Sequence, residues 1–187
     1  PLTYWPDGSV KHAIVSGVAA MTADTPHPVA MTIGTAATGT TVSTSDLATA
    51  LSAGVTAGAG AFGSAVFGSG DWASPFQVVC TGPVMPSWVC RKAIGSDPHL
   101  VAWLEVRMWS TGAVEVFPWD ENGYLTVASP TNKSDTYTFS LGGTSRFSAA
   151  IDIKHHTRIP LISSTEGSAL TFSHWLGTDP GIVPAHD

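Results

Sequence analysis

The sequence predicts an all-β fold, and three observations point to it. Charged residues make up only 12% of the 187 residues, about half the usual share in soluble proteins, which disfavours long helices held by salt bridges. Turn-forming residues are frequent, with 19 Gly and 13 Pro between short apolar stretches. Residues 102–109 alternate between two kinds of side chain, the pattern of a half-buried strand.

Near the start of the chain, the stretch YWPDGSVKHAIV predicts a β-hairpin. Pro6 presets the backbone of a turn, Asp7 accepts local hydrogen bonds, and Gly8 takes the positive φ that the turn requires. We expect one strand over residues 11–18 after this turn and another over residues 29–33. We therefore interpret this stretch as a structural hairpin and not as a catalytic motif.

Residues 41–71 are dominated by Ala, Gly and Ser. Ser45 or Asp46 can N-cap a short helix in this zone, which Gly54 would end. Glycine recurs too often over residues 58–70 for a stable helix, so we expect a flexible or extended excursion there. This zone is the candidate for a linker.

From residue 72 onward the sequence is rich in strand patterns. Alternate residues of the first long strand share a face: one face holds Trp103, Glu105, Arg107 and Trp109, and the other holds Ala102, Leu104, Val106 and Met108. A three-residue loop at residues 110–112 predicts four facing pairs, which are Trp109 with Ala113, Arg107 with Glu115, Glu105 with Phe117, and Trp103 with Trp119. Further strands are expected over residues 137–141 and 149–159, with Gly142-Gly143 and Pro160 as turn signals.

The polar and aromatic face of this hairpin has two interpretations. Aromatic rings beside charged groups can stack on sugar rings and bind their hydroxyls, and the same rings can equally fill the core of a two-layer sheet. The seven Trp residues of the chain favour the sugar interpretation slightly. The candidate carbohydrate-binding residues are Trp103, Arg107, Trp109, Glu115 and Trp119.

Two adjacent histidines lie within the strand expected over residues 149–159. Neighbouring residues of a strand point to opposite faces, so we expect His155 in the core or at an interface and His156 on the polar face. Lys154, His156 and Arg158 would then form a cationic row that could hold a carboxylate, such as the uronate of an acidic polysaccharide. The other interpretation, which we favour, is a solvated polar face of an outer strand.

Several classes of site are missing from the sequence. It contains no nucleophile elbow, P-loop, HExxH or dinucleotide-binding motif. Its seven histidines are scattered without ligand spacing, so neither a metal site nor a cofactor is expected. Glycoside hydrolysis needs two facing carboxylates, and nothing pairs Asp120, Glu121 or Asp152. We expect Cys80 and Cys90 to be buried free thiols, with a disulfide between adjacent strands as the alternative.

Composition also limits the partners. A formal net charge of −6 with only 8 Lys and Arg residues cannot supply the phosphate contacts of a nucleic-acid-binding surface. No run approaches the roughly 18 apolar residues of a membrane-spanning helix. We therefore expect neither nucleic-acid binding nor membrane insertion.

Five stretches of the sequence, taken in order, resemble one known family. They are YWPDGSVKHAIV, GPVMPSWVCRKAI, PHLVAWLEVRMWSTGAVEVFPWDENG, IKHHTRIP and HWLGTDPGIVPAHD. They resemble the N-terminal RIFT-type barrel and following β-sandwich of the exo-rhamnogalacturonan lyase-like (YetA-like) family, and the same modules look similar to parts of large tailed-bacteriophage proteins. The resemblance implies RIFT-barrel-like strands over residues 1–40, a Gly/Ala-rich linker or excursion over residues 41–71, and an antiparallel β-sandwich domain over residues 72–187.

The resemblance implies a parent protein that acts on or near polysaccharide. We expect a non-catalytic structural or glycan-contacting module of a larger bacteriophage virion or tail-associated protein. Its expected partners are other virion proteins, copies of itself, or an acidic polysaccharide. One alternative is a fragment of a rhamnogalacturonan-type lyase, with His156 and Arg158 as candidate catalytic residues. The other is a free carbohydrate-binding module. The expected location is the virion, or else a secreted or periplasmic one.

Overall fold

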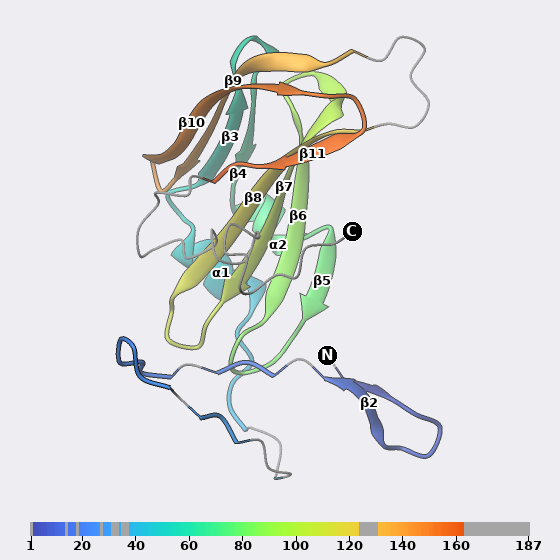
Figure 1. Cartoon of the computed structure of the whole chain (residues 1–187), viewed down its shortest axis with the longest axis vertical. Coiled ribbons are helices and arrows are strands. Elements are labelled where there is room, and N and C mark those ends of the chain that lie inside the picture. The colour runs from blue at the N-terminus through green and yellow to red at the C-terminus, as the bar shows by residue number, and fades with distance from the viewer. Residues whose placement is uncertain are drawn as a thin grey trace.

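The structure of the chain, a computed structural model, describes residues 2–13, 15–17, 19–26, 28–30, 34, 38–123 and 131–162 (Figure 1). Its strands form three sheets of two, four and five strands. Every strand pair in them is antiparallel. The predicted all-β class is therefore confirmed. Within the described residues, none of the three sheets closes into a barrel.

The N-terminal residues form the predicted hairpin. Strand β1 (Leu2–Tyr4) pairs with β2 (Val10–Ala13). Gly8 has a φ of 84°, and the Asp7 carboxylate accepts hydrogen bonds from the Ser9 hydroxyl at 2.7 Å and from its backbone N–H at 2.9 Å. These bonds lower the pKa of Asp7. The strand predicted over residues 11–18 ends at Ala13. Residues 29 and 30 are not in a strand, and the rest of that prediction lies outside the described residues.

The helix predicted in the Ala/Gly-rich zone is present as α1 (Thr44–Ala50). Its N-cap is Ser43 rather than Ser45 or Asp46. The Ser43 hydroxyl accepts a bond from the Asp46 backbone N–H at 3.3 Å, and the Asp46 carboxylate accepts one from the Ser43 backbone N–H at 2.8 Å. This reciprocal pair is a capping box, and it places the acidic residue inside the first turn instead of at the cap.

Residues 58–70, expected to form a flexible or extended excursion, lie partly in extended strands that belong to the folded sheet. The zone continues as strand β3 (Val55–Ala59), the 3-10 turn η1 (Gly60–Phe62), strand β4 (Ser64–Phe67) and helix α2 (Ser69–Ala73). Strand β3 is central, because it pairs with β4 on one side and with β9 (Lys133–Leu141) on the other. Its small residues serve close packing: a Cβ on Gly58 would lie 2.5 Å from the Thr138 hydroxyl. Three alanines of the hairpin are buried, namely Ala57, Ala59 and Ala65.

The remaining strands complete two facing sheets. The four-stranded sheet has the order β10-β9-β3-β4. It includes β9 (Lys133–Leu141) and β10 (Thr144–Ile153). The five-stranded sheet has the order β11-β8-β7-β6-β5. Its strands are β5 (Gln77–Cys80), β6 (Ser87–Ile94), β7 (Asp97–Met108), β8 (Val114–Asn122) and β11 (Thr157–Pro160).

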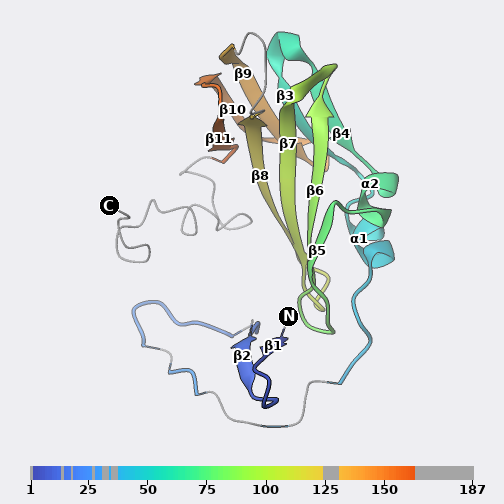
Figure 2. The same cartoon turned by 90° about the vertical axis from the view of Figure 1, so that its right-hand side faces the viewer.

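The larger apolar cluster of the described residues lies between these two sheets, with the helices on one side of the sandwich (Figure 2). It takes alternate residues of β7 together with residues of β3, β4 and β9, as the period of two requires. Its largest fully buried side chains include Trp72, Tyr137, Phe67 and Phe139. The other face of the five-stranded sheet is thereby left for polar and aromatic side chains.

The β7–β8 hairpin has the predicted register. Trp103 faces Trp119, Glu105 faces Phe117, and Arg107 faces Glu115. The Trp109 backbone N–H donates to the Ala113 carbonyl at 2.8 Å, and Gly112 has a φ of 87°. The three-residue loop thus fixes which side chains meet on the outer face.

The single strand predicted over residues 149–159 is divided into β10 and β11. Strand β10 ends at Ile153 in one sheet and β11 starts at Thr157 in the other, so the chain turns at the intervening residues. His156 lies at this turn with a φ of 63°, and its backbone N–H donates to the Asn122 carbonyl at 2.7 Å. The rings of His155 and His156 are 4.0 Å apart, so the prediction that they occupy opposite faces was wrong.

Replacement of Gly95 by alanine is expected to lower the free energy of unfolding by about 2–4 kcal/mol. Gly95 has a φ of 59°, and an added Cβ would lie 2.0 Å from the Phe62 carbonyl oxygen, which is backbone and cannot swing away. Gly142→Ala is the matched control, because Gly142 has a φ of 60° but a Cβ there would meet only an ordinary contact at 3.9 Å. Urea denaturation of both variants measures the difference. Equal losses of unfolding free energy in the two variants would show that the clash with the Phe62 carbonyl oxygen contributes nothing.

Candidate functional site

The outer face of the β7–β8 hairpin holds the candidate side chains. Trp103, Trp109 and Glu115 are half-buried, whereas the intervening residues Ala102 and Leu104 are fully buried in the core. The predicted division of β7 into an aliphatic face and a polar, aromatic face is therefore confirmed.

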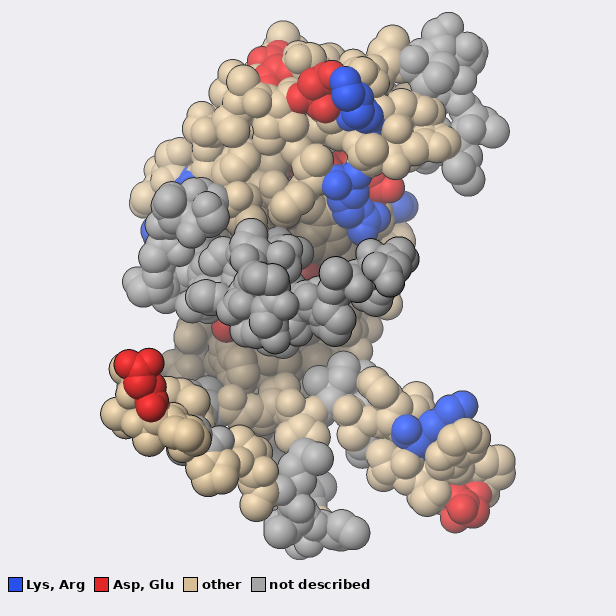
Figure 3. All heavy atoms as spheres, viewed as in Figure 1, with Lys and Arg blue, Asp and Glu red and all other residues tan. Residues whose placement is uncertain are grey.

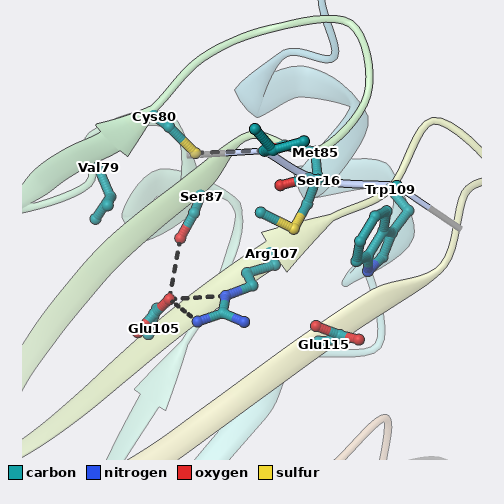
Figure 4. Close-up of a pocket in the computed structure, with 11 residues that line it drawn as sticks. Ser16, Val79, Cys80, Met85, Ser87, Glu105, Arg107, Trp109 and Glu115 are labelled. Carbon is teal, nitrogen blue, oxygen red and sulfur yellow. Dashed lines mark hydrogen bonds and ion pairs between the residues drawn. The ribbon is translucent and has the colours of Figure 1, made fainter. Parts of the chain in front are cut away.

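A pocket of about 510 Å³ opens on this face (Figure 4). Strand pairing brings β5, β6, β7 and β8 together around it, and a segment of the N-terminal region adds a wall. The lining residues are Val15, Ser16, Gly17, Val79, Cys80, Met85, Ser87, Glu105, Arg107, Trp109 and Glu115. Three of the five predicted carbohydrate-binding residues, Arg107, Trp109 and Glu115, thus line one pocket.

The guanidinium of Arg107 is already paired within this pocket. It donates from Nε and from Nη2 to Oε1 of Glu105, both at 2.8 Å. The same Glu105 oxygen accepts a bond from the Ser87 hydroxyl at 3.3 Å. The guanidinium also lies over the Phe117 ring, 4.4 Å from its centroid. These contacts fix Arg107 in place and neutralise its charge against Glu105.

Glu115 and Trp109 differ from this fixed pair. Within the described residues, no hydrogen bond or ion pair engages the Glu115 carboxylate, although Arg107 is its partner in the strand register. No ring or cation of these residues packs on the Trp109 indole either. Figure 4 shows both side chains at the pocket, apart from the Glu105–Arg107 pair. The pocket therefore offers one open carboxylate and one open aromatic surface.

Trp103 and Trp119 form a separate aromatic cluster on the same face. Their rings stack with centroids 6.3 Å apart and planes 6° from parallel. The guanidinium of Arg158 lies 5.3 Å from both centroids, and Phe76 packs edge-on against Trp103 at 5.5 Å. Arg91 lies 4.0 Å from the Phe76 centroid. These two tryptophans pack against neighbours within the protein, and neither lines the pocket.

The proposed cationic row does not form. Its geometry required one continuous strand, which is interrupted before Thr157. Arg158 donates from Nη2 to Oε2 of Glu121 at 2.8 Å, and Lys154 forms an ion pair with Asp152. On the face shown in Figure 3, the Lys and Arg atoms at the right of the body lie beside Asp and Glu atoms. The structure thus gives no group of free cations at this position.

Sequence reasoning missed the burial of Asp120. Its carboxyl has no exposed surface, and neither oxygen has a hydrogen-bond partner within the described residues. Burial raises its pKa to about 8. Asp120 occupies the core side of β8, two residues after the buried Pro118. The alternation of this strand could have revealed it, because Asp120 shares the parity of Val116 and Pro118.

The cysteine prediction is confirmed, since Cys80 and Cys90 are both free and buried. The Cys80 thiol donates to the Met85 carbonyl at 3.4 Å. Burial, with a smaller effect of the Asp71 charge, raises the pKa of Cys90 to about 12. The Cys90 thiol is therefore protonated and unreactive at neutral pH.

In the part of the chain that the structure describes, no three His, Cys, Asp or Glu side chains are grouped to hold a metal. No helix among those residues is long and apolar enough to cross a membrane.

Comparisons with protein-family models, curated proteins and solved structures found no match to this chain. The relation to the YetA-like family thus stays a prediction from the motifs, and function is argued from the pocket itself.

Proposed function

We propose that this chain is a non-catalytic glycan-contacting module of a larger virion or tail-associated protein. Its sugar site is the pocket on the outer face of the β7–β8 hairpin. The observation that carries the proposal is the open indole of Trp109 beside the carboxylates of Glu105 and Glu115 and the guanidinium of Arg107.

These groups match the two surfaces of a sugar ring. The C–H face of a pyranose is apolar and stacks on an indole, while its hydroxyls donate to carboxylates and accept from a guanidinium. The pocket volume of about 510 Å³ lies within the range of small-molecule sites. Arg107 is held by Glu105 and Phe117, so part of the polar surface is fixed before a ligand binds.

The cluster of Trp103 and Trp119 has a supporting role in this proposal. Each ring already packs against the other, and Arg158 lies close to both. These contacts hold β7, β8 and β11 together beside the pocket. The direct contact with sugar is therefore assigned to Trp109 instead.

The lyase alternative receives less support from these residues. A lyase needs a base at the proton next to a uronate and a free positive charge at its carboxylate. The charge of Arg158 is paired with Glu121. His156 lies at the turn before β11 with its ring against that of His155. Neither group is placed to act on a ligand in the pocket, since neither lines it.

Contacts with copies of the chain or with other virion proteins are assigned to exposed apolar side chains elsewhere. Tyr4, Trp5 and Val10 are exposed on the β1–β2 hairpin. Val78 is exposed on β5, an edge strand of the five-stranded sheet, and Phe76 is exposed just before this strand. Exposed apolar groups of this kind are typical of protein contact surfaces.

Trp109→Ala is expected to weaken glycan binding about tenfold or more, because it removes the stacking surface. Trp119→Ala is the matched control, a tryptophan of the same sheet face that does not line the pocket. It is expected to retain the affinity and lose stability. Both variants are titrated with a panel of neutral, amino and acidic oligosaccharides by isothermal calorimetry, after circular dichroism has confirmed the fold. Unchanged affinity in folded Trp109→Ala would overturn the proposal.

A further inference from the structure

We propose that the sugar bound in this pocket carries a free amino group, which pairs with the Glu115 carboxylate. This inference rests on the proposed function, because it names the class of glycan for the same pocket. Protonated amino sugars such as glucosamine belong to that class, and uronates do not.

The charges of the residues that line the pocket indicate a positively charged ligand group. The lining holds two carboxylates, Glu105 and Glu115, against one guanidinium, Arg107. Arg107 makes a two-bond ion pair with Glu105, which leaves Glu115 as the carboxylate without a partner among the described residues. Glu115 is half-buried, so its charge is less screened by water than a fully exposed one. A positively charged ligand group supplies the missing partner.

Strand geometry places the indole of Trp109 close to this carboxylate. The Trp109 backbone bonds to Ala113, and Glu115 follows two residues later with its side chain on the same face. Such diagonal neighbours across a hairpin lie about 7 Å apart. An ammonium group between them would bond to the carboxylate and lie near the aromatic face, an arrangement that favours cations.

The same charges act against a uronate. Its carboxylate would enter a pocket whose unpaired charge is already negative, and like charges brought together in a desolvated site cost affinity. The cations that could have offset this repulsion are engaged, since Arg107 pairs with Glu105 and Arg158 pairs with Glu121. The ligand of this pocket is therefore an amino sugar, in place of the acidic polysaccharide.

The test uses three tetrasaccharides, made of glucosamine, of N-acetylglucosamine and of galacturonate, titrated into the chain by calorimetry. The glucosamine tetramer is expected to bind about tenfold or more tightly than its acetylated form, the size of one charge-assisted hydrogen bond. The galacturonate tetramer is expected not to bind. Glu115→Gln, which keeps the side-chain shape, is expected to remove the difference between the first two.

Glu121→Gln is the matched control. The net charge of −6 attracts any polycation, and this variant removes the same charge from the same strand outside the pocket. It is expected to retain the preference for glucosamine. If Glu115→Gln also retains that preference, or if galacturonate binds as well as glucosamine, the amino-sugar inference is wrong.

The two proposals fail in different ways. Binding of the acetylated tetramer that Trp109→Ala abolishes, without any preference for the free amine, would leave the glycan site standing and overturn the inference. If no saccharide of the series or of the wider panel binds, the glycan site and the inference fall together.

Discussion

Replacement of Asp120 by asparagine will raise the free energy of unfolding at pH 8 by about 3–5 kcal/mol. The Asp120 carboxyl has no exposed surface and no hydrogen-bond partner within the described residues. Burial raises its pKa in the folded protein to about 8, from an ordinary value of 3.8. Each unit of this shift corresponds to about 1.4 kcal/mol, so ionisation costs the folded state roughly 6 kcal/mol. The amide cannot ionise, although it still leaves polar atoms buried, which reduces the gain.

The pH dependence has a definite sign. Below pH 3.8 the carboxyl is protonated in both states and carries no penalty. Between pH 3.8 and 8 the unfolded chain releases a proton that the folded chain keeps, so stability falls by about 1.4 kcal/mol per pH unit. Above pH 8 the loss is complete. Asp7, Asp46, Asp97 and Asp135 act oppositely, because their pKa values are lowered and their stabilisation is lost as the pH falls below 3.8.

Urea denaturation between pH 4 and pH 9 measures both effects. The unmodified chain is expected to lose stability across this range, and Asp120→Asn to lose much less. Asp24→Asn is the control, because Asp24 is exposed and its φ of 55° suits asparagine as well. It is expected to leave the pH profile unchanged. A profile of the unmodified chain that rises towards pH 8, or an asparagine variant no more stable than the parent there, would rule out a neutral buried carboxyl.

Part of this structure, including the burial of Asp120, could be predicted from local sequence patterns. Strand alternation and loop length predicted that Arg107 lies opposite Glu115 and Trp103 opposite Trp119 in the strand register, because both placements depend only on residues close in the sequence. The Pro6-Asp7-Gly8 turn was predictable for the same reason. Extended to β8, alternation would also have placed Asp120 in the core.

Long-range pairing accounts for what the sequence could not predict. Strand β3 is central because it pairs with β9, about eighty residues later. No local signal distinguishes Gly58 and the alanines of this strand from the residues of a linker. The passage from one sheet to the other at residues 154–156 was equally hidden, since it depends on the hydrogen bond from His156 to Asn122. Prediction of the pocket required both the local strand register and the long-range pairing of strands. Its β7–β8 wall followed from register, but the wall from Val79, Cys80 and Ser87 required the fold.

Replacement of Trp72 by alanine will lower the free energy of unfolding by about 3–5 kcal/mol. Trp72 lies on α2, has no exposed surface, and stacks on Phe67 of β4 with ring centroids 5.8 Å apart. Alanine would leave a cavity in the core that the surrounding strands cannot fill without moving. Trp72→Phe is the matched variant and is expected to cost under about 2 kcal/mol. It keeps an aromatic ring and removes an indole N–H that has no hydrogen-bond partner within the described residues.

Thermal and urea denaturation of the two variants measure the loss of core packing, provided that helix α2 stays folded. In the unmodified chain Asp71 accepts a bond from the Gly68 backbone N–H at 2.9 Å and pairs with Lys92 at 3.0 Å. Neither substitution removes these groups, so α2 is expected to keep its polar contacts. The affinity for glycan should be unchanged in the folded fraction of either variant, because Trp72 does not line the pocket. Equal destabilisation by alanine and phenylalanine would show that the N–H or the exact ring shape matters more than core volume. A loss below about 1 kcal/mol with alanine would mean that α2 does not anchor the sandwich.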